Sequence, residues 1–322
     1  MSFHSSLLNL LGRLSFASAS LLVVLSLAVS ATAQTQASCQ FTTFNRRFFI
    51  SSSSGYRTLV PRGVNDYATV AGDAEDDGDF SGRAFTRWSA GNITYYQHTA
   101  NGSPVHTSFT GRTNAGTSFG VAGPRFSLGT TKGTPFTLKG STFTALAMTI
   151  GGIDYTKFTI WGLNRWGTRV GAYTDASGKL HGFRSYSNGN AVSLDYPGSA
   201  QTVATGINDN GTVVGSYTKS LPPNAWWHGF IYNSGKWATL NYPSSTLETM
   251  LTGISNNNAI VGSTVTGRSS VTVTGSFMYQ GGVFKNIVLP NSNVPTSVNG
   301  ISPSKNLITG FSGYTGYIAS CK

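Results

Sequence analysis

Residues 206–215 read GINDNGTVVG, and near copies of this ten-residue box recur along the chain. A typical copy has an aliphatic residue after the first glycine, then turn-forming residues, then a β-branched pair before the closing glycine. This order is typical of two short strands joined by a tight turn. The six copies begin 44 to 51 residues apart, at Gly63, Gly111, Gly162, Gly206, Gly253 and Gly300. A repeat of this length predicts a stacked or circular array of similar units.

A second short pattern follows each box, a triplet that ends in an aromatic residue. The triplets are Arg83–Phe85, Thr134–Phe136, His181–Phe183, His228–Phe230, Gly275–Phe277 and Thr315–Tyr317. A turn and another strand come next, so one unit reads as four short strands, the content of a propeller blade. We therefore predict an all-β fold, a single propeller with six blades. The copy at Gly111 (GRTNAGTSFG) is degenerate, which leaves five or seven blades as alternatives.

The alternation of the box with a His-Ala/Gly-Phe triplet resembles the HAF family of probable extracellular repeat proteins. The resemblance covers most of residues 63–317, and the copies at Gly162 and Gly206 match best. It implies export and a repeat-built β fold, and it implies no particular reaction. Only His181 and His228 keep the histidine of the triplet.

Residues 1–33 predict a secretory signal peptide, with a short apolar run from Leu21 to Val29 and a small-residue cleavage pattern at Ala31–Ala33. The propeller domain is then residues 34–322, with no membrane span expected. The net charge of +11 reflects scarce acids, since charged residues make up only 10% of the chain. This balance favours anionic partners outside the cell. Export argues against nucleic acid, and we expect a monomer.

The ends of the chain predict how the ring closes. The last unit runs out at Lys322 after its third strand, and residues 40–44 form an unassigned strand before the first box. We predict that this N-terminal strand completes the last blade, from residue 39 onward. Cys39 and Cys321 would then lie side by side, and in an exported protein such a pair predicts a disulfide. An alternative uses residues 48–50 and 56–60 as the completing strands.

An acidic run, residues 73–79 (DAEDDGD), follows the first box and holds five of the chain's eleven acids. Carboxylates at alternate positions around a glycine bend are ligands that Ca²⁺ prefers. Asp73, Glu75, Asp77 and Asp79 are therefore predicted to hold a structural Ca²⁺ in a loop. A solvated acidic turn is the other interpretation.

Aromatic residues supply the predicted ligand-binding site. The insertion before the triplet at His228 places Trp226 and Trp227 after two prolines, and His228 belongs to the predicted ligand-binding site with them. Trp161 and Trp166 flank the box at Gly162 and complete the predicted set. Exposed indoles provide flat platforms for sugar rings. Core packing between blades is the alternative for each of them.

No zinc-protease motif or phosphate-binding loop is present in the sequence. We therefore predict an exported, non-catalytic binding module for extracellular polysaccharide or another anionic surface polymer. A glycan-cleaving hydrolase or lyase with its site in the central channel is one alternative. A purely structural envelope protein is the other.

Overall fold

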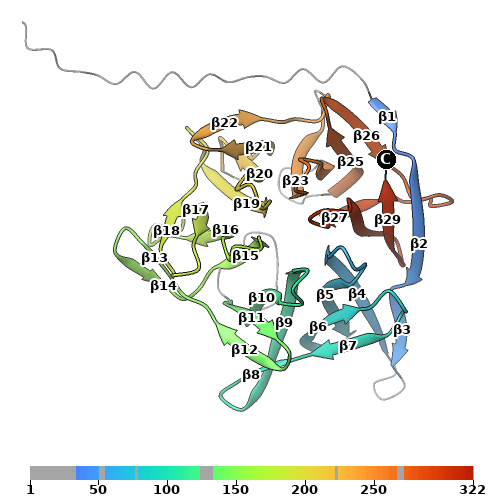
Figure 1. Ribbon diagram of the computed structural model, residues 1–322, viewed down its shortest axis with the longest axis horizontal. Helices are drawn as coiled ribbons and strands as arrows, with labels where there is room; N and C mark the ends of the chain where they lie inside the picture. The colour runs from blue at the N-terminus through green and yellow to red at the C-terminus, as the bar shows by residue number, and fades with distance from the viewer. Residues whose placement is uncertain are drawn as a thin grey trace, which may run out of the picture.

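Six β-sheets surround a central axis in the computed structural model, and together they form a six-bladed propeller (Figure 1). The structure describes residues 34–321 except 51–54, 77–78, 124–132, 222–223, 245 and 267–271. The predicted signal peptide lies outside the described residues. Within them every regular element is a strand, and no helix is present that could cross a membrane.

The first three blades follow one another along the chain. Blade 1 contains β3 (Arg47–Ile50), β4 (Gly55–Val64), β5 (Val70–Asp76), β6 (Asp79–Arg87) and β7 (Ile93–Tyr96). Blade 2 contains β8 (His98–Ala100), β9 (Ser103–Arg112), β10 (Ser118–Gly123), β11 (Thr134–Lys139) and β12 (Thr142–Ala145). A hairpin of β13 (Met148–Ile150) and β14 (Ile153–Tyr155) precedes blade 3. Blade 3 contains β15 (Thr159–Leu163), β16 (Arg169–Thr174), β17 (Leu180–Ser185) and β18 (Ala191–Ser193).

The last three blades complete the circle. Blade 4 contains β19 (Gln201–Ile207), β20 (Val213–Thr218), β21 (His228–Asn233) and β22 (Lys236–Thr239). Blade 5 contains β23 (Glu248–Ile254), β24 (Ile260–Thr266), β25 (Thr272–Gln280) and β26 (Val283–Ile287), with β1 (Gln34–Gln36) added parallel to β26. Blade 6 contains β27 (Ser297–Ile301), β28 (Leu307–Ser312), β29 (Thr315–Cys321) and β2 (Cys39–Asn45).

Each box forms the turn between the first two of the four repeated strands of its blade, as predicted; in blades 1 and 2, where β3 and β8 are added strands, these are β4 and β5, and β9 and β10. In blade 4 the side-chain oxygen of Asn208 accepts hydrogen bonds from the backbone of Asn210 (3.1 Å) and Thr212 (2.9 Å). Gly211 in the same turn has a φ of +80°, a conformation that glycine adopts without steric cost. Asn65 and Asn164 make the same pair of bonds in blades 1 and 3. The repeated residues of the box therefore form the same turn in each of these blades.

The closing glycine of the box and the aromatic residue of the triplet occur together because they are in contact. In five blades, a Cβ on this glycine would lie 2.7 to 3.0 Å from the ring or hydroxyl of the triplet aromatic. In blade 4 the pair is Gly215 and Phe230, and Phe230 is fully buried. Apolar clusters continue across the blade boundaries; one joins Val170 of blade 3 to Ala204 and Val213 of blade 4. Each blade thus buries its faces against its neighbours.

The ring closes through the N-terminal strand. Strand β2 pairs antiparallel with β29, from Cys39 opposite Cys321 to Asn45 opposite Thr315, and the two cysteines form a disulfide. Both predictions are confirmed. The alternative closure is wrong, because residues 48–50 and 56–60 pair with each other as β3 and β4 of blade 1.

The acidic run does not form a loop, in contrast to the prediction. Residues 73–76 belong to β5 and Asp79 to β6, so only residues 77–78 lie between the two strands. Arginines on β4 account for the difference, since Arg57 pairs with Asp76 (2.5 Å) and Arg62 with Asp73 (2.8 Å). These ion pairs hold the acidic residues against the neighbouring strand.

Candidate functional site

A central channel of about 620 Å³ runs between the first strands of the six blades, which are β4, β9, β15, β19, β23 and β27. Its wall has three levels. The box turns of blades 2 to 6 form the rim of the channel wall. The second box residues of all six blades form a ring below it, and the residues before the first box glycine form a third level. Hydrogen-bonding, apolar and guanidinium groups all face this one space.

The third level is set by a β-bulge that recurs in every blade. The register between the first two strands shifts by one residue immediately before the first box glycine. A bulge redirects a side chain and increases the local twist. The bulged residues are Arg62, Thr110, Trp161, Thr205, Thr252 and Asn299, and all of them line the channel.

Four of the bulged residues tie their blade to the next one. The hydroxyl of Thr110 donates to Ile160 O (2.6 Å), Thr205 to Leu251 O (2.7 Å) and Thr252 to Val298 O (2.9 Å). The Asn299 amide donates to Pro61 O (2.6 Å) across the closing junction. The bulge is thus a structural connection in most blades.

Arg62 and Trp161 depart from this pattern. The Arg62 guanidinium donates two hydrogen bonds to Asp73 (2.8 and 3.0 Å), whose side chain is buried and also accepts a hydrogen bond from Ser108. Trp161 packs against a small core cluster of Ala172, Leu180 and Val203 between blades 3 and 4. Two of the six bulge positions therefore carry side chains larger than a hydrogen bond to the next blade requires.

The ring below the rim is aliphatic except at one position. Val64, Leu163, Ile207, Ile254 and Ile301 occupy the second box position in five blades, and Arg112 occupies it in blade 2. Arg112 donates to Ser118 Oγ (2.8 Å), and its guanidinium lies 5.4 Å from the Trp88 ring centroid. Its Nε is buried without a hydrogen-bond partner, and burial lowers the pKa of this guanidinium. Arg112 is thus a partly desolvated cation in an apolar ring.

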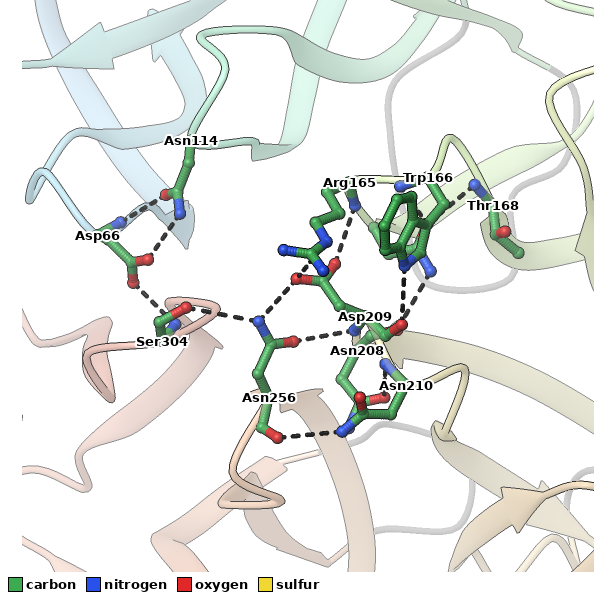
Figure 2. A network of polar contacts seen from close by, with 11 residues as sticks. Asp66, Asn114, Arg165, Trp166, Thr168, Asn208, Asp209, Asn210, Asn256 and Ser304 are labelled. Carbon is green, nitrogen blue, oxygen red and sulfur yellow. Dashed lines mark hydrogen bonds and ion pairs between the residues drawn. The ribbon is translucent and has the colours of Figure 1, made fainter.

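The rim is held by a chain of polar contacts between neighbouring turns, shown in Figure 2. Asn256 donates to Asp209 Oδ2 (2.7 Å), and the backbone of Ser304 donates to Asp66 (2.9 Å). Asn114 donates to the other oxygen of Asp66 (2.6 Å). Burial alone would raise the pKa of Asp66, but hydrogen bonds from Ser304, Asn114 and Lys305 lower it below its usual value. Both rim carboxylates therefore accept several hydrogen bonds within the ring of turns.

Two aromatic side chains project from the tips of the rim turns. Tyr67 in blade 1 is 65% exposed and Trp166 in blade 3 is 61% exposed. The Trp166 indole N–H donates to Asp209 O (2.9 Å), and the Arg165 guanidinium lies 4.3 Å from the ring centroid (Figure 2). The indole is thus held in place while much of its surface meets solvent. Sugar rings commonly bind to platforms of this kind.

The structure divides the predicted ligand-binding tryptophans between the two ends of the propeller. Trp166 lies in a rim turn, whereas Trp226 and Trp227 precede β21, at the other end of strand β20. The backbone N–H of Trp227 donates to Glu248 (2.8 Å), and that of Trp226 donates to Thr218 (3.1 Å). His228 is half-buried and lies 3.0 Å from the Asn241 amide. A single site containing all five predicted residues is therefore not formed.

The triplet histidines occupy equivalent places in blades 3 and 4. His181 lies between Asp195 (2.7 Å) and Asp175 (3.1 Å) and stacks on Tyr173. In blade 4 the corresponding residues are His228, Asn241, Lys219 and Tyr217. An amide replaces one carboxylate and a cation replaces the other, while the contact between the tyrosine and histidine rings is kept. This repetition favours a structural role for both histidines.

The predicted calcium ligands are only partly described. Asp73 is engaged by Arg62 and Ser108, whereas Asp77 and the side chain of Asp79 lie outside the described residues. Among the described residues, no group of three or more acidic, histidine or cysteine side chains has the arrangement of a metal site. Calcium binding by this run stays a prediction.

The comparisons with known proteins concern the fold alone. No family model and no curated protein matches the sequence. A catalytically inactive variant of virginiamycin B lyase from Staphylococcus aureus has a TM-score of 0.45 and 9% identity, over 87% of this chain and 99% of that one. A gluconolactonase from Xanthomonas campestris has a TM-score of 0.47 and 10% identity, over 91% and 98%. The β-propeller domain of the Trilobed protease from Pyrococcus furiosus has a TM-score of 0.45 and 9% identity, over 80% of each chain.

At this level of similarity no activity transfers from these proteins to this chain. The predicted likeness to HAF repeat proteins also stays a prediction. The channel itself is therefore the source of any functional conclusion. Sequence reasoning missed Arg112 as a site residue, although its signal was present. It stands in the degenerate copy, at a position that is aliphatic in the other five.

Proposed function

We propose that this is an exported, non-catalytic binding protein that takes an extracellular polysaccharide at the rim end of its channel. The observation that carries the proposal is the exposed Trp166 on the rim, between the channel-lining residues Arg165 and Gly167, together with the exposed Tyr67 on the turn of blade 1. Aromatic platforms next to amide and guanidinium donors suit the apolar faces and hydroxyl edges of sugar rings. The disulfide is consistent with an oxidising compartment outside the cytosol.

The composition of the channel wall supports binding over cleavage. Among the described lining residues, Asp209 supplies the carboxylate, and it is already engaged by Asn256 and Arg165. Glycoside hydrolysis by the common route uses a pair of carboxyl groups facing the same bond. The guanidinium, amide and apolar groups that make up the rest of this wall position a ligand without supplying a proton acceptor.

The test is retention of residues 34–322 on a panel of immobilised polysaccharides, with the eluates assayed for cleavage products. We expect saturable retention without products. Trp166→Ala should weaken it by about tenfold, or about 1.4 kcal/mol, because the platform is lost. Trp226→Ala is the matched control at the other end of the propeller and should bind as the parent protein does.

Each other outcome points to a different function. Loss of retention in Trp226→Ala but not in Trp166→Ala would move the site to the opposite end. Release of products would establish the glycan-cleaving alternative. No retention on any polysaccharide would leave the structural envelope protein as the remaining interpretation.

A further inference from the structure

Three consecutive turns of the rim hold the exposed Trp166 in one orientation (Figure 2). The Trp166 indole N–H donates to Asp209 O (2.9 Å), and the backbone N–H of Arg165 donates to Asp209 Oδ1 (3.0 Å). Asn256 of the next blade fixes Asp209 in turn, because its amide donates to Asp209 Oδ2 (2.7 Å) and its Oδ1 accepts from Asp209 N (2.9 Å). The indole therefore keeps its position without help from a ligand.

Charge is balanced at this point of the rim. Arg165 Nε lies 3.7 Å from Asp209 Oδ2, so one cation faces one carboxylate. Both oxygens of this carboxylate already accept hydrogen bonds, from Arg165 N and from the Asn256 amide. An anionic sugar would meet the Asp209 carboxylate here, and a cationic sugar would meet the Arg165 guanidinium. A neutral sugar therefore suits this surface best.

Two groups beside the indole are able to form further hydrogen bonds. The Arg165 guanidinium lies over the Trp166 ring, 4.3 Å from its centroid, and 66% of the Arg165 side chain is exposed. Asn210 directly follows the Asp209 carbonyl to which the indole bonds. The exposed Asn210 amide donates to Asn256 O (3.3 Å), whereas its Oδ1 accepts no hydrogen bond from the residues that the structure describes. One donor group and one acceptor thus lie beside an exposed indole.

We propose that Arg165, Trp166 and Asn210 form a subsite for an N-acetylated hexose, which they bind through its acetamido group. The proposal rests on the proposed function and names the sugar class for the same rim site. An acetamido group is a planar amide with one N–H donor, one carbonyl acceptor and one methyl group. Its N–H donates to Asn210 Oδ1, and its carbonyl accepts from the Arg165 guanidinium. Its methyl group packs with the sugar ring on the exposed part of Trp166.

A hexose with a hydroxyl at the same carbon fits this subsite less well. A hydroxyl has one proton and one oxygen at a single point, so it bonds to Asn210 or to Arg165 but does not span both. It also lacks the methyl group that packs on the indole. Because both polar groups are exposed, water replaces the bond that is lost, and the preference should be about tenfold, below the factors that buried polar groups give.

The test is titration calorimetry of residues 34–322 with two trisaccharides that share one linkage, the first built from N-acetylglucosamine and the second from glucose. The two ligands differ only in the acetamido group of each sugar. The parent protein should bind the N-acetylated trisaccharide about tenfold more tightly. Trp166→Ala should weaken the binding of both, because it removes the platform on which the proposed function depends.

Asn210→Ala is the informative variant, because it removes the acceptor of the acetamido N–H. The hydrogen bonds that Asn208 accepts from the backbone of this turn remain, so the melting temperature should match that of the parent. We expect its affinity for the N-acetylated trisaccharide to fall about fivefold or more, while the glucose trisaccharide binds as before. Asn257→Ala is the matched control, since Asn257 is exposed at the same box position in blade 5, and it should bind both ligands as the parent does.

Equal affinity of the parent for the two trisaccharides would overturn the acetamido subsite, while the polysaccharide-binding function would stand. The subsite would also be wrong if Asn210→Ala kept the full preference, or if Asn257→Ala lost as much of it. Failure of the parent to bind the N-acetylated trisaccharide, with retention on another polysaccharide, would overturn the subsite alone. No binding of either trisaccharide and no retention on any polysaccharide would overturn the subsite and the proposed function together.

Discussion

Asp73 is a carboxylate inside a β-sheet, and its burial makes its partners essential. Only 1% of its side chain is exposed, and Arg62 and Ser108 supply its hydrogen bonds. Removing one member of a buried ion pair leaves the other charge without compensation. Asp73→Asn should therefore lower the free energy of unfolding by about 3 kcal/mol, measured by urea denaturation.

Asp154→Asn is the matched control, because Asp154 is exposed and its carboxylate is bonded only to Thr149 (2.6 Å) among the residues that the structure describes. It should change the free energy of unfolding by less than about 0.5 kcal/mol. Equal losses in the two variants would contradict a special cost of burial at Asp73.

His228 gives the fold a dependence on pH. Burial lowers the pKa of His228 below its usual value of 6.5, and Lys219 adds to the effect. Asn241 Oδ1 accepts from Gly229 N, so the amide N–H of Asn241 donates to His228 Nδ1, which must be unprotonated. As pH falls below about 6.5, the unfolded chain takes up a proton that the folded chain resists, and stability falls.

Urea midpoints measured between about pH 7.5 and pH 5 test this coupling. His228→Gln should remove this contribution to the pH dependence. Lys219→Gln should reduce it, because one source of the lowered pKa is gone. A parent midpoint that stays constant over this range would contradict the argument.

Individual site residues were harder to predict from the sequence than the fold was. Alternation along a strand predicts which face a side chain occupies, but the bulge before each box shifts that alternation by one residue. Trp161 therefore lies in the channel wall and Trp166 on the rim, although one directly precedes the box at Gly162 and the other lies within it. The channel takes one residue from each of six distant positions, and sequence alone does not show that they converge.

At the scale of elements, the repeated bulge supports a prediction about how blades adhere. The Thr205 hydroxyl donates to Leu251 O of the next blade, and this carbonyl faces the junction. Thr205→Val keeps the shape of the side chain and removes the donor. We expect a loss of about 1 kcal/mol in the free energy of unfolding, whereas Thr205→Ser should lose less because it keeps the hydroxyl. Equal losses in both variants would attribute the effect to packing.

The repeating elements were predictable because their chemistry is local. A turn asparagine, a left-handed glycine and an aromatic residue against the closing glycine form the same contacts wherever they recur. The hairpin β13–β14 and the added strands β1 and β8 occur once each and were missed, and β3 was considered only as a strand that would close the ring. Their pairing depends on the sheet edge beside them, which a single segment of sequence does not show.

At the scale of the whole molecule, the ring depends on joining its two ends. Six sheets that each pack on two neighbours leave no free lateral face once blade 6 meets blade 1. The chain achieves this by placing β2 beside β29, so residues from both ends share one sheet. Closure was predictable because the last repeat lacked a strand and the N-terminal segment supplied one.

The disulfide between Cys39 and Cys321 locks this shared blade. The two residues are 282 positions apart, so the bond restricts nearly the whole unfolded chain. The chain-entropy model gives about 5–6 kcal/mol for such a loop, and measured values are often smaller. Replacing both cysteines by serine should lower the free energy of unfolding by about 3–5 kcal/mol while the ring stays closed, because the seven residue pairs of β2 and β29 remain.

Two measurements on the double variant separate these contributions. Its urea midpoint should fall to that of the parent protein under reducing conditions, since both lack the same bond. Hydrogen exchange should remain slow in β29, which β2 still covers. If β2 instead detaches, the exposed edge of β29 becomes available for pairing with another chain, and the variant should self-associate on size exclusion. An unchanged midpoint would show that strand pairing alone closes the propeller.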